Sequence, residues 1–333
     1  MTAAERQASS SAATVEAVVR AGGPQLAQLL ERTEERLMAL AAGHGPTLGR
    51  HATATIAAGG KRLRPLLVFL AAGDVASAAV EERLVRAAVA VELIHSASLV
   101  HDDVLDAASL RRGMPTVVAA AGRTIATATG DLLFSRAFAE LAAGGEVEDM
   151  RALSAAASAL SHGELLQRAD AWDPTISLER YLHRCELKTG SLFEAACRLG
   201  ALAAGDLSDR LALFGRRIGL AFQLLDDVLD VSGPASRTGK ARGTDLLDGT
   251  VTLPLILARE REPALARLDL RALRTEEQAE DVCDRIAATG ALEAAKERAL
   301  VVVEEARAAL PALPAAQRQT LELVAKGVVE RYA

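Results

Sequence analysis

Two acidic segments with the same five-residue sequence constrain this chain more than any other feature. Residues 102–106 and residues 226–230 both read DDVLD, so each places aspartates at positions i, i+1 and i+4. On a helix, the first and last of these aspartates lie on one face, one turn apart. Both segments have apolar surroundings, where acidic pairs are costly unless a cation joins them. Oxygen ligands favour a hard divalent ion, Mg²⁺ above all, and Mg²⁺ commonly brings phosphate with it.

A single copy of this motif would be better interpreted as a solvated acidic helix end. Two identical copies favour a shared function over chance. If the two helices face each other, six carboxylates repel strongly in a cavity of low dielectric constant, and several divalent ions between them reverse the sign of that interaction. The sequence therefore predicts a site for metal and phosphate that two helices share.

The composition predicts a large helical core. Half of the 333 residues are apolar and only 3% are aromatic, with Ala and Leu dominant. We therefore expect an all-α fold, with residues 1–20 as a flexible N-terminal tail and residues 21–333 as one helical domain. The net charge of −6 does not favour a nucleic-acid surface.

Two further features concern the cellular setting. Charged residues interrupt every apolar run, so we expect no transmembrane segment. The three cysteines, Cys185, Cys197 and Cys283, lack the spacing of a metal site. The simplest interpretation is reduced thiols in a cytoplasmic protein.

Helical periodicity recurs along the whole chain, and no alternating strand pattern is present. Residues 111–116 and 232–250 are polar and contain glycine, which predicts loops, the second of which could act as a lid. The ranges expected to be helical are 24–42, 48–58, 65–72, 80–105, 117–128, 131–141, 150–168, 178–203, 208–231, 252–259, 276–288, 291–309 and 315–330.

Basic residues cluster near the first acidic motif. Lys61 and Arg64 precede a predicted helix N-terminus, where the helix dipole also favours anions, although alone they could be a charged cap. Arg111 and Arg112 follow the motif; the alternative to a binding role is a solvated loop. His95 lies two turns before Asp102 on the same helix face, but a lone histidine on an apolar helix is usually a hydrogen-bonded core residue.

Three segments accompany the second acidic motif. Lys188 and Thr189 lie in an otherwise apolar helix, where a lysine can simply extend its amine to solvent. Gln223 lies three residues before Asp226 and points in roughly the same direction. Lys240 belongs to the loop that follows and could close over a bound anion.

These motifs together resemble those of the trans-isoprenyl diphosphate synthase, or polyprenyl synthetase, family. The resemblance rests on residues 59–65 (GGKRLRP), His95, residues 99–106, residues 111–116 (RRGMPT) and residues 163–164. It continues through residues 188–189, 223–230, 239–240, Asp245 and residues 252–254, in the order of the family. The match covers roughly residues 48–257.

The resemblance implies a helical bundle of the isoprenoid synthase type around a deep central cavity, usually in a homodimer. It implies that isopentenyl diphosphate is joined to an allylic diphosphate, with three Mg²⁺ ions held across the cavity mouth. Asp102, Asp106 and Asp226 would be the principal metal ligands, helped by Asp103, Asp227 and Asp230. The allylic diphosphate would be held by Arg111, Lys188, Gln223 and Lys240, and Thr189 would face the allylic cation. Isopentenyl diphosphate would be held by Lys61, Arg64, His95 and Arg112.

The residues just before Asp102 would form the floor of the product tunnel. Short-chain family members tend to place aromatic residues at the fourth and fifth positions upstream, where this chain has Ser98 and Ala97. Ile94 and Val91 lie deeper, and one helical turn of about 5.4 Å is comparable to one isoprene unit. These small residues favour products longer than C15, although they could instead serve close helix packing.

Other functions stay open at this point. A short-chain synthase that makes farnesyl or geranylgeranyl diphosphate would keep the same motifs. A class I terpene cyclase would share the metal motif but would not need the second basic cluster. A non-catalytic subunit would be expected to lack one acidic motif, and both are intact. Thr250 stands where the family often has lysine, which removes one possible phosphate contact.

Overall fold

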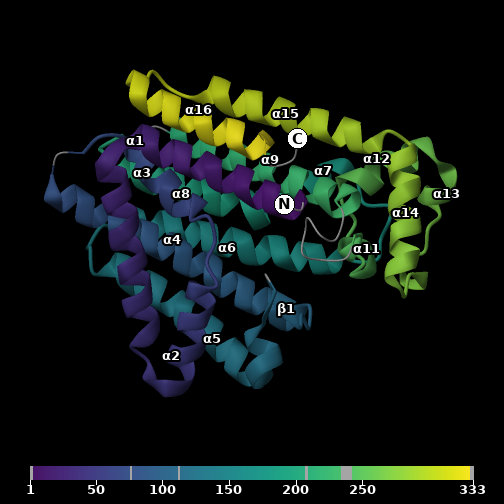
Figure 1. Cartoon of the computed structure of the whole chain (residues 1–333), viewed down its shortest axis with the longest axis horizontal. Coiled ribbons are helices and arrows are strands. Elements are labelled where there is room, and N and C mark those ends of the chain that lie inside the picture. The colour runs from purple at the N-terminus through teal and green to yellow at the C-terminus, as the bar shows by residue number, and fades with distance from the viewer. Residues whose placement is uncertain (1–2, 76, 112, 207–208, 234–241, 331–333) are drawn as a thin grey trace.

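The computed structural model describes residues 3–75, 77–111, 113–206, 209–233 and 242–330, with side chains from residue 15 onward. Within these ranges the regular structure is helical apart from one two-stranded hairpin, as the composition predicts, and turns and loops join the elements (Figure 1). The helices are α1 Ala3–Ala42, α2 Gly45–Ala57, α3 Leu63–Ala72, α4 Ala78–Leu105, α5 Val117–Ala142, α6 Val147–Ala169, α7 Leu178–Cys185, α8 Ser191–Ala203, α9 Arg210–Ser232, α11 Thr244–Leu247, α12 Leu253–Arg261, α13 Pro263–Ala266, α14 Glu276–Ala288, α15 Ala291–Ala309 and α16 Ala315–Glu330. Strands β1 Leu110–Arg111 and β2 Met114–Pro115 pair antiparallel, within the segment predicted as a loop.

Several predicted helices have the expected bounds, and two differ for identifiable reasons. α14, α15 and α16 begin and end where the periodicity places them. α5 is continuous where the sequence predicts a break near Gly130. A Cβ atom at Gly130 would lie 2.2 Å from the His101 ring, so this glycine allows α4 and α5 to approach closely. The non-helical backbone of α5 lies instead at Gly122, with φ of 81°.

The N-terminal helix α1 begins earlier than the periodicity indicates. It includes residues 3–20, where the sequence predicts a flexible tail, and changes direction at Gly23, whose φ is 77°. Pro24 follows directly, a position that suits the first turn of a new helical segment. Val18, in the first half, is only 1% exposed and belongs to the main core. Its apolar contacts explain why α1 extends beyond the predicted start.

One predicted helix, residues 178–203, is interrupted by a wider turn. α7 and α8 are joined by a π-helical segment, Glu186–Gly190, that contains Lys188 and Thr189. Such π turns are rare and are found mostly at functional sites. Hydrophobic periodicity cannot reveal one, because a single extra residue shifts the helix face only locally.

Helix α4 is the central core helix that carries the first acidic motif. It packs against α5, α3, α8 and α1, while α8 in turn packs against α9, which carries the second motif. In the described part of the chain α4 is also the one helix that is long and apolar enough to cross a membrane, although charged residues such as Arg86 and Glu92 interrupt its apolar run, as the sequence indicates. Because 78% of its most apolar window is buried inside the fold, its hydropathy fits a core helix.

Candidate active site

The first acidic motif lies at the C-terminal end of α4, and basic side chains contact each of its aspartates. Asp103 is nearly buried and accepts a hydrogen bond from Arg111 Nε at 2.8 Å. Asp106 pairs with Arg168 on α6, and Asp102 Oδ2 lies 4.0 Å from Lys188 Nζ. The motif is therefore a carboxylate cluster with matched cations around it.

Lys188 and Glu164 link the first motif to the neighbouring helices. Lys188 Nζ pairs with Glu164 on α6, and Glu164 Oε1 also accepts from Arg168 Nε at 3.0 Å. Burial disfavours the charged lysine, but Asp102 and Glu164 outweigh it and raise the pKa of Lys188. Burial, opposed in part by Lys188, raises the pKa of Asp102 to about 6.

Gly163 makes this arrangement possible. A Cβ atom at Gly163 would lie 2.5 Å from the backbone nitrogen of Lys188, so α6 and the π turn touch through their backbones. The contact holds the lysine ammonium between two carboxylates, one from α4 and one from α6.

In the second acidic motif, on α9, the middle aspartate is bound by neutral donors. The buried Asp227 accepts hydrogen bonds from the Tyr181 hydroxyl and from Gln223 Nε2, the latter at 2.8 Å. Gln223 Oε1 in turn accepts from Thr189 Oγ1 at 2.7 Å. Burial and the charge of Asp245 raise the pKa of Asp227 to about 7, although the two donors oppose this shift.

Asp230, the last aspartate of the second motif, is half-buried and contacts the segment that follows α9, whereas Asp226 is exposed. The Asp230 carboxylate accepts from the backbone N–H of Asp245 at 3.3 Å, and its backbone carbonyl accepts from Gly243 N at 3.0 Å. These two contacts fix the return of the chain beside the motif. Lys240, proposed to close over an anion, lies outside the described residues.

Side chains from both acidic motifs line one polar cavity of about 160 Å³. Asp106 comes from the first motif and Asp227 from the second. Among the other residues predicted to act in the site, Lys188, Thr189 and Gln223 also line this cavity, and so does Thr250. The cavity thus brings together one aspartate of each motif, whereas Asp102, Asp103, Asp226 and Asp230 are not among its lining residues.

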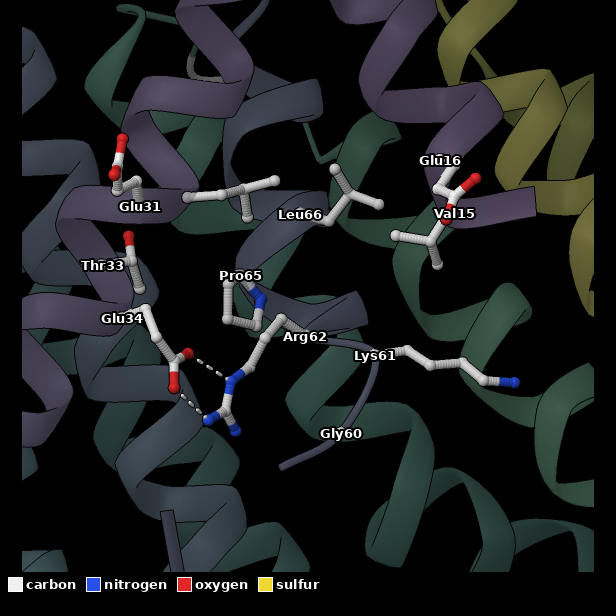
Figure 2. Close-up of a pocket in the computed structure, with 11 residues that line it drawn as sticks. Val15, Glu16, Glu31, Thr33, Glu34, Gly60, Lys61, Arg62, Pro65 and Leu66 are labelled. Carbon is white, nitrogen blue, oxygen red and sulfur yellow. Dashed lines mark hydrogen bonds and ion pairs between the residues drawn. The ribbon is translucent and has the colours of Figure 1, made fainter. Parts of the chain in front are cut away.

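The second basic cluster lies elsewhere on the fold. Lys61 lines a separate cavity of about 520 Å³ between α1 and the segment that leads into α3 (Figure 2). The Arg64 guanidinium lies 4.6 Å from the centre of the Phe193 ring, and His95 is half-buried on α4. Arg112 lies outside the described residues, so its part in this cluster stays a prediction.

The residues expected to form the tunnel floor are tightly packed. Val91, Ile94 and Ala97 have no exposed surface, and Ser98 is 7% exposed and donates its hydroxyl to the His95 carbonyl. A long product beside these residues would therefore need side chains to move aside, since close-packed interiors leave no empty channel.

The donor set fits a hard cation that shares its coordination shell with another ligand. Among the described residues, no three histidine, cysteine or acidic side chains converge on one point as a metal cage. Mg²⁺ is usually held by one or two carboxylates together with water and substrate phosphates, so an open carboxylate pair is the expected arrangement. Burial is the main cause of the raised pKa values of Asp102 and Asp227, and a nearby cation would oppose that rise at either carboxylate.

Several cavity or motif contacts were not predicted as site residues from the sequence. They are Glu164, Arg168, Tyr181, Arg184 and Asp245. Glu164 and Arg168 lie four residues apart and could have been recognised as a pair on one helix face. Tyr181 lies 46 residues before Asp227, and nothing local in the sequence joins them.

Comparison with known proteins agrees with this geometry. Residues 46–289 match the model of the family described as Polyprenyl synthetase. The chain is 42% identical over 242 residues to heptaprenyl diphosphate synthase component 2 of Geobacillus stearothermophilus, which covers 71% of this chain and 73% of the relative. It is 36% identical over 266 residues to octaprenyl diphosphate synthase of Escherichia coli, with 78% and 82% covered.

Solved structures share the whole fold. A decaprenyl diphosphate synthase from Rhodobacter capsulatus superposes with a TM-score of 0.86 at 32% identity, over 96% of this chain and 99% of that one. A polyprenyl synthase from Caulobacter crescentus, complexed with calcium and isoprenyl diphosphate, gives 0.85 at 34% identity, over 96% and 98%. On the family match and these relatives, the chain belongs to the polyprenyl synthetase family.

Proposed function

We propose that this chain is a Mg²⁺-dependent prenyltransferase that condenses isopentenyl diphosphate with an allylic diphosphate to make a trans-polyprenyl diphosphate longer than C15. The observation that carries the proposal is the polar cavity lined by aspartates of both DDVLD motifs together with Lys188 and Gln223. Such a cavity offers carboxylates for metal together with cationic and amide donors for phosphate.

The metal would be held chiefly by Asp102, Asp106 and Asp226, with about three ions by family resemblance. Asp103, Asp227 and Asp230 support that set, directly or through water. Bound Mg²⁺ supplies charge stabilisation to the departing diphosphate. Arg168 now pairs with Asp106, so that guanidinium must exchange partners when the carboxylate takes up a cation.

The allylic diphosphate is bound by Lys188, Gln223, Arg111 and Lys240. Lys188 keeps its proton because its pKa is raised, so it offers a full positive charge to the leaving group. Thr189 and Gln223 present oxygen dipoles toward the allylic carbon as positive charge develops there. The bond between the allylic carbon and its diphosphate oxygen breaks, and the isopentenyl double bond attacks that carbon. The condensed product then loses a proton, which passes to the released diphosphate.

The isopentenyl diphosphate is held by the second cluster, Lys61, Arg64, His95 and Arg112. A second anion site separates this enzyme from a terpene cyclase, which takes one diphosphate substrate. One relative is named component 2 of its synthase. We propose that this chain instead acts as a homodimer in the cytoplasm, where its three buried cysteines stay reduced.

The test is product analysis with purified chain, Mg²⁺, isopentenyl diphosphate and each allylic primer in turn. We expect a ladder of products beyond C15, with no turnover when isopentenyl diphosphate is omitted. Turnover of the primer alone would indicate a cyclase. Inactivity of the chain by itself, restored by a second protein, would indicate one subunit of a heteromeric synthase.

Chain length is tested by Ala97→Phe, with Ala97→Val as a graded control. Because Ala97 has no exposed surface, added volume there must narrow any path beside α4, at a cost in stability of about 1–3 kcal/mol. We expect shorter products in the order Phe, Val, wild type, with the first condensation retained. An unchanged product length in a folded Ala97→Phe variant would remove Ala97 from the tunnel floor.

A further inference from the structure

The segment between α2 and α3 contains a strained arginine between two proposed substrate ligands. Arg62 has a left-handed backbone, with φ of 47° and ψ of 35°, and it lies between Lys61 and Arg64. This conformation is uncommon and unfavourable for a residue with a side chain, so surrounding contacts must hold it.

The Arg62 guanidinium makes those contacts with three different elements. Its Nε and Nη2 each donate to the Glu34 carboxylate of α1 at 2.8 Å. Nη1 donates to Glu92 of α4 at 2.7 Å, and Nη2 also donates to the Ile56 carbonyl at 2.8 Å. The paired contact with Glu34 is the bidentate geometry that arginine forms and lysine cannot.

Burial makes this anchor expensive to break. The Arg62 side chain is 16% exposed and the Glu92 side chain only 5%. Loss of the Arg62 guanidinium would remove a countercharge from the buried Glu92 and from Glu34. Glu92 lies on α4 ten residues before Asp102, so the anchor joins the basic segment to the helix that carries the first metal motif.

The two neighbours of the anchor point in different directions. Figure 2 shows the Arg62 side chain turned toward Glu34, while the Lys61 side chain extends in the other direction, away from Glu34. Arg64 turns instead to the face of Phe193. The left-handed backbone of Arg62 thus sets the directions in which the Lys61 ammonium and the Arg64 guanidinium point.

We propose that Arg62 is a positioning residue for the homoallylic substrate: it does not contact the diphosphate but fixes the directions of Lys61 and Arg64. This inference rests on the proposed function, in which those two residues hold isopentenyl diphosphate. It predicts a selective effect on the affinity for one substrate, because the allylic site at Lys188 and Gln223 shares no contact with Arg62.

The central variants are Arg62→Asn and Arg62→Lys. Asparagine tolerates the left-handed backbone but loses the anchor, and lysine keeps the charge but not the bidentate contact. Arg36→Gln is the matched control, since Arg36 also joins α1 to α4 and α5, through Glu82 and Glu140, without touching the basic segment. Glu34→Gln, at a residue whose side chain is 45% exposed, gives a milder disruption that should fold normally.

For Arg62→Asn we expect a roughly tenfold higher KM for isopentenyl diphosphate, with kcat and the KM for the allylic primer changed by less than about twofold. Calorimetric titration with isopentenyl diphosphate alone should show the same loss of affinity. Arg62→Lys and Glu34→Gln should show smaller losses in the same direction. Arg36→Gln should lower the melting temperature while both KM values stay at the wild-type level.

Equal changes in both KM values, or wild-type affinity in folded Arg62→Asn and Glu34→Gln, would overturn the positioning role. Lys61→Gln separates this failure from failure of the proposed function. If Lys61→Gln leaves the affinity for isopentenyl diphosphate unchanged, the substrate assignment itself is wrong. If Lys61→Gln weakens binding and Arg62→Asn does not, only the positioning role is wrong.

Discussion

The two DDVLD motifs have the same sequence, but their middle aspartates have different partners. Asp103, at the end of α4, accepts from the Arg111 guanidinium, and Arg168 and Lys188 reach the other two aspartates of that motif. Asp227, on α9, accepts from two neutral donors, a tyrosine hydroxyl and a glutamine amide. Identical local sequence therefore does not give identical electrostatics, because partners come from other helices.

This difference suggests a division of labour between the motifs. The first motif already has positive charge nearby, so a bound cation must compete with Arg168 for Asp106. The second motif has a buried carboxylate whose pKa is raised to about 7, so its charge is poorly compensated in the absence of a cation. Asp227 should therefore gain more from a nearby cation than Asp103, which already pairs with Arg111.

The largest effect is expected from removal of one charge in either motif. Asp102→Asn and Asp226→Asn should each lower kcat by roughly a thousandfold or more, because both are proposed metal ligands. Steady-state kinetics with saturating Mg²⁺ measures this. Asp281→Asn, at an exposed position on α14, is the control and should retain full activity. Near-wild-type turnover of Asp226→Asn would mean that Asp226, unlike a metal ligand, is not needed for catalysis.

The second prediction concerns stability against pH in metal-free protein. The pKa of Asp227 is raised to about 7 from an ordinary 3.8, so the folded state holds a proton that the unfolded state releases. As the pH rises from roughly 5 to roughly 8, this difference should lower the free energy of unfolding by on the order of 2 kcal/mol. Denaturant titration in the presence of a chelator measures this decrease.

Comparison of two variants shows which motif causes the fall in the free energy of unfolding as the pH rises. Asp227→Asn should remove most of this fall. Asp102→Asn should remove a smaller part at lower pH, since the pKa of Asp102 is raised only to about 6. If the free energy of unfolding falls equally with pH in wild type and in Asp227→Asn, then Asp227 does not cause this pH dependence.

The smallest effect is expected for Arg168→Gln, which removes a cation from the first motif. Without metal, the variant should lose about 1 kcal/mol of stability, because Asp106 and Glu164 lose a shared partner. Mg²⁺ with inorganic pyrophosphate should then raise the melting temperature more than in wild type. The control is Arg151→Gln, an exposed pair with Glu148 on the same helix. A smaller rise in Arg168→Gln would show that the arginine aids cation binding.

Much of this architecture follows from local sequence. Helices α14, α15 and α16 were predicted to the residue because amphipathic periodicity and glycine or proline breaks coincide there. The acidic motifs and Lys188 could be identified because their charges interrupt apolar helices. Gly130 misled the prediction, since a glycine at a helix crossing looks in sequence like a helix stop.

The electrostatic partners could not be predicted in the same way. Tyr181 reaches Asp227 across 46 residues, and Arg168 reaches Asp106 across 62, so both contacts depend on how helices pack. The π turn at Glu186–Gly190 and the left-handed Arg62 are likewise imposed by tertiary contacts. Pair interactions between distant segments leave no periodic signal in one sequence.

The packing of α1 has a practical consequence for anyone who trims this protein. The family match starts at residue 46 and stops at residue 289, yet α1 and α16 lie outside it and pack against each other. Gln317 on α16 donates to the Leu70 and Ala71 carbonyls at the end of α3. A gene fragment cut at the borders of the match would discard both outer supports of α3, and it should yield insoluble material instead of a smaller synthase.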